Sequence, residues 1–212
     1  AGILPVHVFG RPCRITELVE IAEERGLRVI EDACEALGSK ASGRPMGSFG
    51  DASVFAFYPN KQITTGEGGM VVTDDDAMAQ DLRSLRNQGR DSDGTWLNHV
   101  QLGYNYRLDD LSAAIGVAQL ERLAELRAGR ARAAASYLGA LGGVESGQLA
   151  GGGRAVVGVW FVFGVRVHAA GTRDRLWQTL DRGGRAGRPG GGRLALARVV
   201  GGLGGVRPCD GR

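Results

Sequence analysis

The sequence predicts an α/β fold, because short apolar runs that are typical of strands alternate with segments of helical periodicity. The apolar and aromatic run 53–57 and the run 70–73 predict two covered strands, and a third strand at 28–32 ends in two acids. Helices are predicted at 15–25, before the acidic strand, and at 77–86, after the last strand. Alternation of this kind is expected of a sheet that packs against helices.

Residues at the ends of the predicted helices favour those ends. Gly26 follows the helix at 15–25, and glycine terminates helices well because it adopts the left-handed conformation without strain. In the helix at 77–86, Leu82 and Leu85 are expected to face the core. The candidate N-caps of this helix are Asp74, Asp75 and Asp76.

A longer helical region is predicted from Asp110 towards Leu141. Its apolar residues recur at helical spacing and are expected to form a stripe against the core. The stripe consists of Leu111, Ile115, Ala118 and Leu123, and the charged residues expected on the outside are Glu121, Arg122, Glu125 and Arg127. Such a stripe usually serves packing, so no chemistry is assigned to it.

Length, composition and cysteine usage exclude several classes of protein. The chain has 212 residues, 43% of them hydrophobic, which is enough for one substantial core or a core with part of a second domain. No apolar run is long enough to span a bilayer and no signal-peptide pattern is present, so a cytoplasmic location is the default. Three dispersed cysteines, Cys13, Cys34 and Cys209, favour reduced thiols, and the three dispersed histidines predict no structural metal site.

Lys61 is the strongest candidate for a chemical role, because the chain has only one other lysine, Lys40. Arginine supplies nearly all other positive charge, so a lysine here favours an amine that must lose its proton and attack a carbonyl. It lies between the two predicted strands 53–57 and 70–73, and burial there would lower its pKa. The segment therefore predicts Schiff-base chemistry, although spacing alone is more often explained by a solvated loop residue.

Asp32 and Glu35 follow the acidic strand and are expected in a crevice at the carboxyl end of the sheet, where open α/β folds bind ligands. Pyridoxal phosphate needs a lysine for its aldehyde and a carboxylate beside its pyridine nitrogen, which Lys61 and Asp32 would supply. Two alternatives stay open: Asp32 as the N-cap of a following helix, and Glu35 as a solvated helix residue. His7 is a weaker candidate, either near the cofactor ring or hydrogen-bonded in the core.

Several motifs, in the same order, resemble those of the DegT/DnrJ/StrS-type sugar aminotransferases, which are fold-type I pyridoxal phosphate enzymes. The motifs are Val29-Ile-Glu-Asp-Ala-Cys-Glu-Ala-Leu-Gly-Ser39, Gly47-Ser-Phe-Gly-Asp51, the run from Phe55 through Lys61 to Asp74, Leu85-Arg-Asn-Gln-Gly-Arg90, Leu102-Gly-Tyr-Asn-Tyr-Arg-Leu108 and the helix 110–123. The resemblance implies that residues 1–142 are a partial large domain of that fold, a three-layer α/β structure with a mostly parallel sheet. Residues 143–180 resemble the start of a small α+β C-terminal domain, with a strand at 156–167 and a helix at 172–180.

The resemblance also implies roles for particular residues. Lys61 matches the lysine that carries the cofactor and moves the proton, and Asp32 matches the partner of the pyridine nitrogen. Glu35 stands where many members have Gln or His near the phenolic oxygen of the cofactor. Asn105 matches an asparagine that reaches the cofactor phosphate of a neighbouring subunit, which implies a homodimer with shared sites. Ala56 stands where some members have a serine that binds the phosphate.

Both ends of the chain depart from the family pattern. Members have an N-terminal segment that binds the cofactor phosphate at a helix start. This sequence begins after that segment and has no initiating methionine, so a fragment or an incomplete gene product is expected. Residues 181–212 hold seven arginines against two aspartates and show little apolar periodicity, which predicts disorder. A frameshift in a GC-rich gene is favoured over a nucleic-acid-binding tail as their explanation.

The function implied by the resemblance is transfer of an amino group from glutamate to a nucleotide-linked keto-sugar. Deoxyamino-sugar, cell-surface polysaccharide and antibiotic-sugar biosynthesis use such reactions. Two alternatives remain: a non-catalytic remnant that holds no cofactor, and a dehydratase of the same superfamily. The dehydratase is disfavoured, because related dehydratases replace the lysine that is present here as Lys61. No nucleic-acid or membrane partner is expected.

Overall fold

The computed structural model describes residues 1–91, 98–141, 147–149, 156–163 and 165–167. These residues belong to two compact units. Residues 1–131 and 156–161 lie in the first unit, and the remaining described residues lie in the second. The candidate site residues all belong to the first unit.

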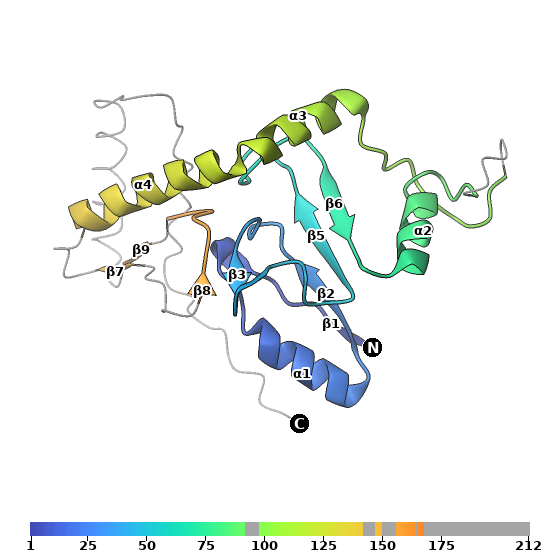
Figure 1. The fold of residues 1–212 in the computed structure, drawn as a ribbon, viewed down its shortest axis with the longest axis horizontal. Helices are drawn as coiled ribbons and strands as arrows, with labels where there is room; N and C mark the ends of the chain where they lie inside the picture. The colour runs from blue at the N-terminus through green and yellow to red at the C-terminus, as the bar shows by residue number, and fades with distance from the viewer. Residues whose placement is uncertain (92–97, 142–146, 150–155, 164, 168–212) are drawn as a thin grey trace. The chain divides into compact units, whose positions relative to one another are not determined.

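A four-stranded sheet organises the first unit, with the strand order β1-β2-β5-β6 (Figure 1). Its strands are β1 (Gly2–Ile3), β2 (Arg28–Asp32), β5 (Ala52–Ala56) and β6 (Gly69–Val72). β1, β2 and β5 run parallel, and β6 is antiparallel to β5. Because β2 and β5 are parallel neighbours, their carboxyl ends lie at the same edge of the sheet. The three strands predicted from the sequence are confirmed, each within one residue of its expected bounds.

β6 is the edge strand of this sheet, and all of its residues are exposed. Met70 is 49% exposed and Val71 is 43% exposed. The sequence predicts a covered strand here, and that expectation is wrong for the described residues, because β6 has a neighbouring strand on one side only.

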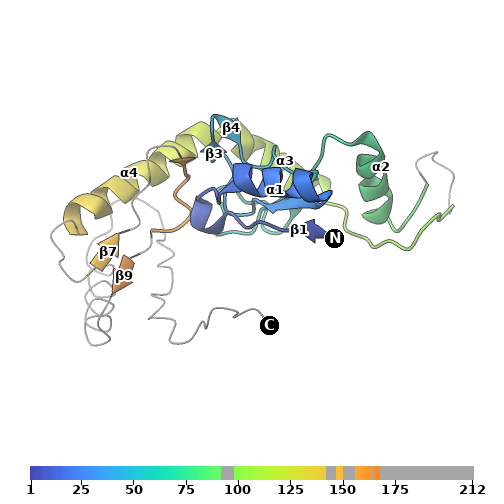
Figure 2. The same cartoon turned by 90° about the horizontal axis from the view of Figure 1, so that it is seen from below.

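Helix α1 (Ile15–Arg25) packs against β1 and β2 and lies on one face of the sheet (Figure 2). It buries Ile15 and Ala22, which join Val29 of β2 in the main apolar cluster. The helix ends at Gly26, whose left-handed backbone (φ 59°) directs its N–H to carbonyls of the last turn. Both predicted ends of this helix are confirmed.

Helix α2 (Asp76–Leu85) begins at Asp75, whose carboxylate accepts a hydrogen bond from a backbone N–H of the first turn at 3.0 Å. The predicted capping by this aspartate cluster is therefore confirmed. The expectation that Leu85 faces the core is wrong, because Leu85 is 38% exposed and α2 contains no buried residue. Backbone hydrogen bonds donated by Tyr104 and Tyr106, rather than leucine packing, hold the end of α2.

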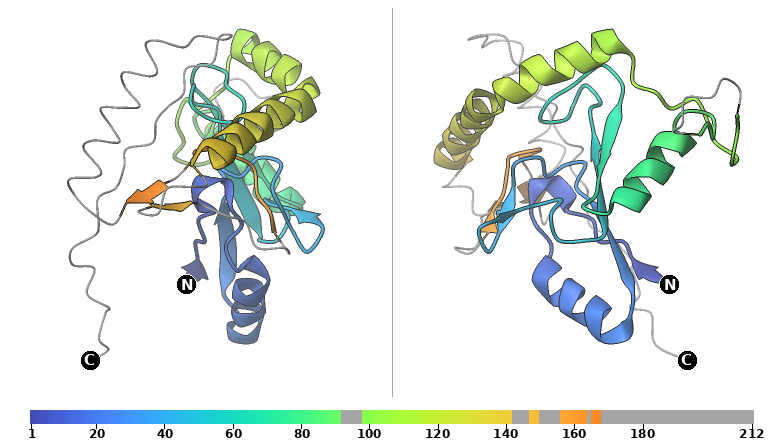
Figure 3. Two further views of the ribbon diagram at one scale, coloured as in Figure 1. Left: turned by 90° about the vertical axis from the view of Figure 1, so that its left-hand side faces the viewer. Right: turned by 45° about the vertical axis from the view of Figure 1, so that its right-hand side comes forward.

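The helical region predicted from Asp110 divides at Arg122 into α3 (Asp110–Glu121) and α4 (Leu123–Leu141). The inward stripe predicted there is wrong, because three of its residues are exposed: Leu111 (81%), Ile115 (49%) and Ala118. The apolar residues of α3 are distributed around the whole helix, so their spacing identifies no single inward face. The buried residue of α3 is Gly116, which lies against Thr65 of the loop between β5 and β6. Figure 3 shows α3 passing beside this loop. No helix in the described part of the chain is both long and apolar enough to cross a membrane.

Two smaller sheets complete the described structure. In the first unit, β3 (Lys40–Ala41) pairs with β4 (Arg44–Pro45) and with β8 (Val156–Val157). In the second unit, β7 (Gly147–Leu149) pairs with β9 (Val165–Val167). β8 and β9 thus belong to different sheets.

The single strand predicted at 156–167 is therefore wrong. After β8 the chain leaves strand geometry, because the Val159 N–H bonds Gly10 and Ser39 instead of a neighbouring strand. The helix predicted at 172–180 and the tail 181–212 lie outside the described residues. The predicted domain boundary at residue 142 stays a prediction.

Glu31 of β2 is a carboxylate with no exposed surface. Its two oxygens accept hydrogen bonds of 2.7–3.1 Å from three backbone N–H groups and two side chains: Gly47, Phe49, Gly50, Ser53 and His7. Burial opposes ionisation of Glu31, but the hydrogen bonds, first that from His7 and then those from the backbone, lower its pKa to about 2. The charge of Glu31 therefore fixes the turn at 47–50 against β2.

His7 is fully buried beside Glu31. Its Nδ1 accepts a hydrogen bond from the Cys13 N–H at 3.2 Å, so Nε2 carries the proton and donates to Glu31 at 3.0 Å. The pair joins the segment before α1 to β2. Of the two interpretations left open for His7, the structure confirms the hydrogen-bonded core residue.

Replacing Glu31 with Gln is expected to lower the free energy of unfolding by about 3–5 kcal/mol, because an amide leaves buried donors without an acceptor. In the wild-type chain the folded pKa lies below the ordinary value of 4.5, so about 3 kcal/mol of stability is expected to disappear as the pH falls from 4.5 towards 2. Urea denaturation at neutral pH and along an acid series measures both effects. Glu20→Gln on the exposed side of α1 is the matched control, and equal losses in the two variants would contradict this account.

Candidate active site

The loop between β5 and β6 is closed by hydrogen bonds that converge on Phe57 and so position Lys61. The Phe57 N–H donates to the Gly68 carbonyl at 2.8 Å, and the Phe57 carbonyl accepts from the Thr65 N–H at 3.0 Å. Inside this loop the Lys61 N–H donates to the Tyr58 carbonyl at 2.9 Å, which makes a tight turn. The side chain of Lys61 is mostly buried, with 15% of its surface exposed.

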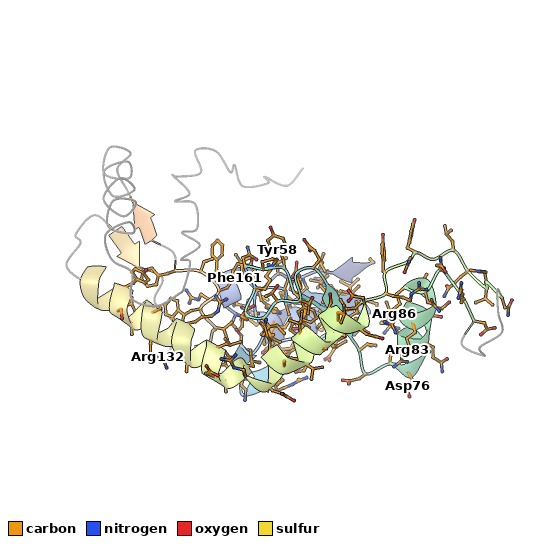
Figure 4. The ribbon with its side chains drawn as sticks, turned by 90° about the horizontal axis from the view of Figure 1, so that it is seen from above. Tyr58, Asp76, Arg83, Arg86, Arg132 and Phe161 are labelled. Atoms are coloured by element: carbon orange, nitrogen blue, oxygen red, sulfur yellow. The ribbon has the colours of Figure 1, made fainter. Side chains whose placement is uncertain are left out.

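The Lys61 amine lies between an acid and an aromatic ring. Its Nζ is 3.6 Å from Oε1 of Glu35 and 4.7 Å from the centroid of the Phe161 ring, which is labelled in Figure 4. The first contact is an ion pair and the second is a cation–π contact. Both come from residues distant in sequence, so only the folded chain places the amine.

Glu35 connects Lys61 to the segment before α1. Its Oε2 accepts a hydrogen bond from the Phe9 N–H at 2.7 Å, and the backbone carbonyl oxygen of Glu35 accepts one from the side-chain amide of Gln62. Phe9 lies in the short 3-10 helix η1 (Val8–Gly10) and has left-handed backbone angles (φ 59°, ψ 26°), which are rare for a bulky residue. Such strain persists only where surrounding contacts enforce it, and the Glu35 carboxylate is one of those contacts.

Asp32 ends β2 on the face opposite to Glu31, because successive side chains alternate along a strand. Its N–H donates to the Pro5 carbonyl at 2.9 Å, and its own carbonyl accepts from the His7 N–H at 3.0 Å. Its Oδ1 accepts a hydrogen bond from the Cys34 N–H at 3.1 Å. Burial, and then the neighbouring Asp32, raise the pKa of the Cys34 thiol to about 11, so this thiol is protonated and unreactive at neutral pH.

The structure brings Asp32, Glu35 and Lys61 to one edge of the sheet, at the carboxyl ends of β2 and β5. Residues 33–38 form turns rather than a helix, so Asp32 caps no helix and Glu35 is no solvated helix residue. Both alternatives left open by the sequence are therefore wrong. The catalytic and cofactor-binding roles of these residues stay predictions.

Asn105 does not belong to this cluster. It is exposed, forms an isolated β-bridge with Asn87, and lies on the segment that follows the end of α2. Its two neighbours, Tyr104 and Tyr106, stack with ring centroids 5.2 Å apart. The contact with a neighbouring subunit that the sequence implies for Asn105 stays a prediction.

Three further residues lie at the site but are not identified by the sequence pattern: Gln62, Arg130 and Phe161. Arg130 donates to the Lys61 carbonyl at 2.7 Å. The sequence signal that could have identified Arg130 is its spacing of one helical turn from Arg127. The side chain of Arg127 also turns inward and lies against Gly38. The expectation that Arg127 is on the outside of its helix is wrong for this reason.

The groups at this edge fit pyridoxal phosphate. Lys61 supplies an amine for the aldehyde, and Asp32 supplies a carboxylate for the ring nitrogen. Gln62 is 4% exposed, and its side-chain Oε1 has no hydrogen-bond partner among the described residues. A buried acceptor of this kind is expected to receive a donor from a bound molecule. Across the described part of the chain, no cluster of His, Cys, Asp and Glu side chains is arranged to hold a metal ion.

Comparison with known proteins gives consistent matches. The model of the DegT/DnrJ/EryC1/StrS aminotransferase family matches residues 1–188. A GDP-perosamine synthase of Caulobacter vibrioides is 42% identical over an alignment of 194 residues that covers 89% of this chain and 51% of that protein. A GDP-perosamine synthase of Escherichia coli O157:H7 is 48% identical over 121 residues, which are 57% of this chain and 33% of that protein.

A solved structure is similar as well. The crystal structure of S. venezuelae DesV in complex with a ketimine intermediate matches with a TM-score of 0.78 and 37% identity, covering 86% of this chain and 48% of that one. The likeness confirms the predicted α/β fold of the fold-type I class. The chain spans about half the length of the Caulobacter and S. venezuelae proteins.

Proposed function

The chain belongs to the DegT/DnrJ/EryC1/StrS aminotransferase family, and from that premise we propose that it transfers an amino group from glutamate to a nucleotide-linked keto-sugar with pyridoxal phosphate. The observation that carries the proposal is the mostly buried Lys61 amine, held beside Glu35 at the sheet edge where Asp32 ends β2. Relatives named GDP-perosamine synthase support a sugar nucleotide as the substrate class. The cytoplasmic location expected from the sequence is part of the same proposal.

Three residues of this chain have distinct roles in the proposal. Lys61 holds the cofactor through its aldehyde, and the Asp32 carboxylate keeps the ring nitrogen protonated. The buried Oε1 of Gln62 offers an acceptor to a donor group of a bound molecule. The bound cofactor supplies an electron sink for the carbon that loses its proton.

Lys61 is also the proposed base. Once the amino donor has displaced it, its Nζ would take the proton from the donor α-carbon. In the second half-reaction the same Nζ would deliver a proton to the sugar carbon that receives the amino group. The Glu35 carboxylate and the Phe161 ring limit the positions that the free amine reaches. Proton transfer requires such positioning, because donor and acceptor must meet within hydrogen-bond distance.

The relatives' names favour this catalytic function over the non-catalytic remnant. The presence of Lys61 also weighs against a dehydratase, because related dehydratases replace this lysine. Product analysis separates an amino-sugar from a dehydrated sugar.

Reduction with borohydride after addition of pyridoxal phosphate is expected to attach the cofactor to Lys61, as located by peptide mass. Lys61→Ala is expected to abolish the adduct, because it removes the amine that the fold holds at the site. Lys40→Ala changes the other, exposed lysine and is expected to leave the adduct in place. No adduct on the wild-type chain, or one on Lys40 alone, would refute the proposal and support the remnant.

Asp32→Asn is expected to keep the Lys61 adduct and to lower turnover about 10²–10⁴-fold, because a neutral amide does not hold the ring nitrogen protonated. Release of 2-oxoglutarate from glutamate measures the turnover. Asp81→Asn, at an exposed position of α2, is the matched control and is expected to behave as wild type. Undiminished turnover in Asp32→Asn would remove this aspartate from the mechanism.

A homodimer with shared sites is part of the same proposal. Asn105 lies outside the Lys61 cluster, on a segment with large exposed apolar side chains such as Leu102 (83%) and Tyr106 (72%). Leu111, at the start of α3, is also 81% exposed. Large apolar side chains that are exposed on neighbouring segments are a feature of protein–protein contacts.

Mixing two defective variants tests this sharing. Lys61→Ala and Asn105→Ala chains are each expected to be impaired alone, and their equimolar mixture is expected to regain about a quarter of wild-type turnover, since half of the dimers then contain one intact site. Failure of the mixture to exceed either variant, under conditions where sedimentation shows dimers, would place Asn105 in its own subunit's site or in none.

A further inference from the structure

Arg130 of α4 hydrogen-bonds the backbone of two separate segments at the site. Its Nη2 donates to the Lys61 carbonyl at 2.7 Å. Its Nη1 donates to the Trp160 carbonyl at 3.2 Å and to the Phe161 carbonyl at 3.3 Å. Burial lowers the pKa of Arg130, but a guanidinium stays charged at any physiological pH, so all three hydrogen bonds are charge-assisted.

The segment 158–161 is fixed independently at its other end. The Val159 N–H donates to the Gly10 carbonyl and to the Ser39 hydroxyl oxygen, both at 3.0 Å. Any side chain at position 10 would overlap the Val159 carbonyl oxygen, so glycine permits this close approach. Val159 is therefore anchored near η1, and beyond it the Phe161 N–H donates to the Val159 carbonyl at 3.0 Å while Arg130 holds the carbonyls of Trp160 and Phe161.

A hollow of about 390 Å³ lies between α4 and the segment 158–160, lined by Ala124, Arg127, Ala128, Arg130, Ala131, Gly158, Val159 and Trp160. The hydrogen bonds of Arg130 connect α4 to this segment beside the hollow. The same guanidinium connects both to Lys61.

We propose that Arg130 is a positioning residue that fixes the Lys61 amine by holding the Lys61 backbone and the Phe161 ring in one arrangement. Arg130 itself reaches only carbonyl oxygens and acts through Lys61 and Phe161. A planar guanidinium is suited to this task, because its separate N–H groups serve three acceptors in fixed directions, whereas a lysine ammonium is a single point. The inference rests on the proposed function only in treating Lys61 as the reacting amine.

The chain contains a built-in reference for testing this. It has two lysines, the mostly buried Lys61 and the exposed Lys40. Limited acylation of the cofactor-free chain, read out by peptide mass, gives the ratio of Lys61 to Lys40 modification. In Arg130→Met the Phe161 segment is released and the amine becomes accessible, so this ratio is expected to rise severalfold. Arg130→Lys keeps the positive charge but loses the planar guanidinium with its separate N–H groups, so a smaller rise of the Lys61 to Lys40 ratio is expected.

Arg132→Met is the matched control, because Arg132 is an exposed arginine of the same helix (Figure 4). Its ratio is expected to equal that of wild type. Circular dichroism verifies that each variant is folded. If Arg130→Met does not fold, the ratio measured for the folded Arg130→Lys variant tests the inference in its place. An unchanged ratio in a folded Arg130 variant would overturn the inference. Because the readout uses no cofactor, failure of borohydride trapping would refute the proposed function and leave this test unaffected.

Discussion

The ionised carboxylate of Glu31, removed from water inside the first unit, is the constraint on which the rest of the structure depends. A buried charge is stable only when its oxygens are fully hydrogen-bonded, and here five donors converge on it. Those donors come from the segment before α1, the turn at 47–50 and the start of β5. The hydrogen bonds to this one carboxylate therefore fix the mutual positions of three segments that surround β2.

The position of Glu31 determines the face of the sheet on which the side chain of Asp32 lies. Because side chains alternate along a strand, satisfying Glu31 on one face of β2 directs Asp32 to the other face, at the carboxyl end of the sheet. The turns that follow β2 carry Glu35 to Lys61 and to the strained backbone of Phe9. Core and site are thus built from consecutive residues of one strand.

Sequence patterns predicted the elements whose signals are local. The helix at 15–25 is confirmed, with Gly26 supplying the left-handed residue that ends it, and Lys61 stood out because the chain uses lysine so rarely. The predictions failed where the signal was ambiguous or distant. Apolar residues all round α3 gave no unique inward face, and the run 156–167 was divided because Val159 bonds Gly10 and Ser39 rather than a strand.

The sequence by itself determined the α/β class, the order of its elements and the residues able to do chemistry, because backbone propensity, caps and residue type are properties of short segments. Only the tertiary structure decided what surrounds those residues. Arg130 is 69 residues from Lys61 in the chain, yet its guanidinium bonds the Lys61 carbonyl. No local periodicity encodes a contact of that kind, since it arises only when separate segments enclose a charge that must find acceptors away from water.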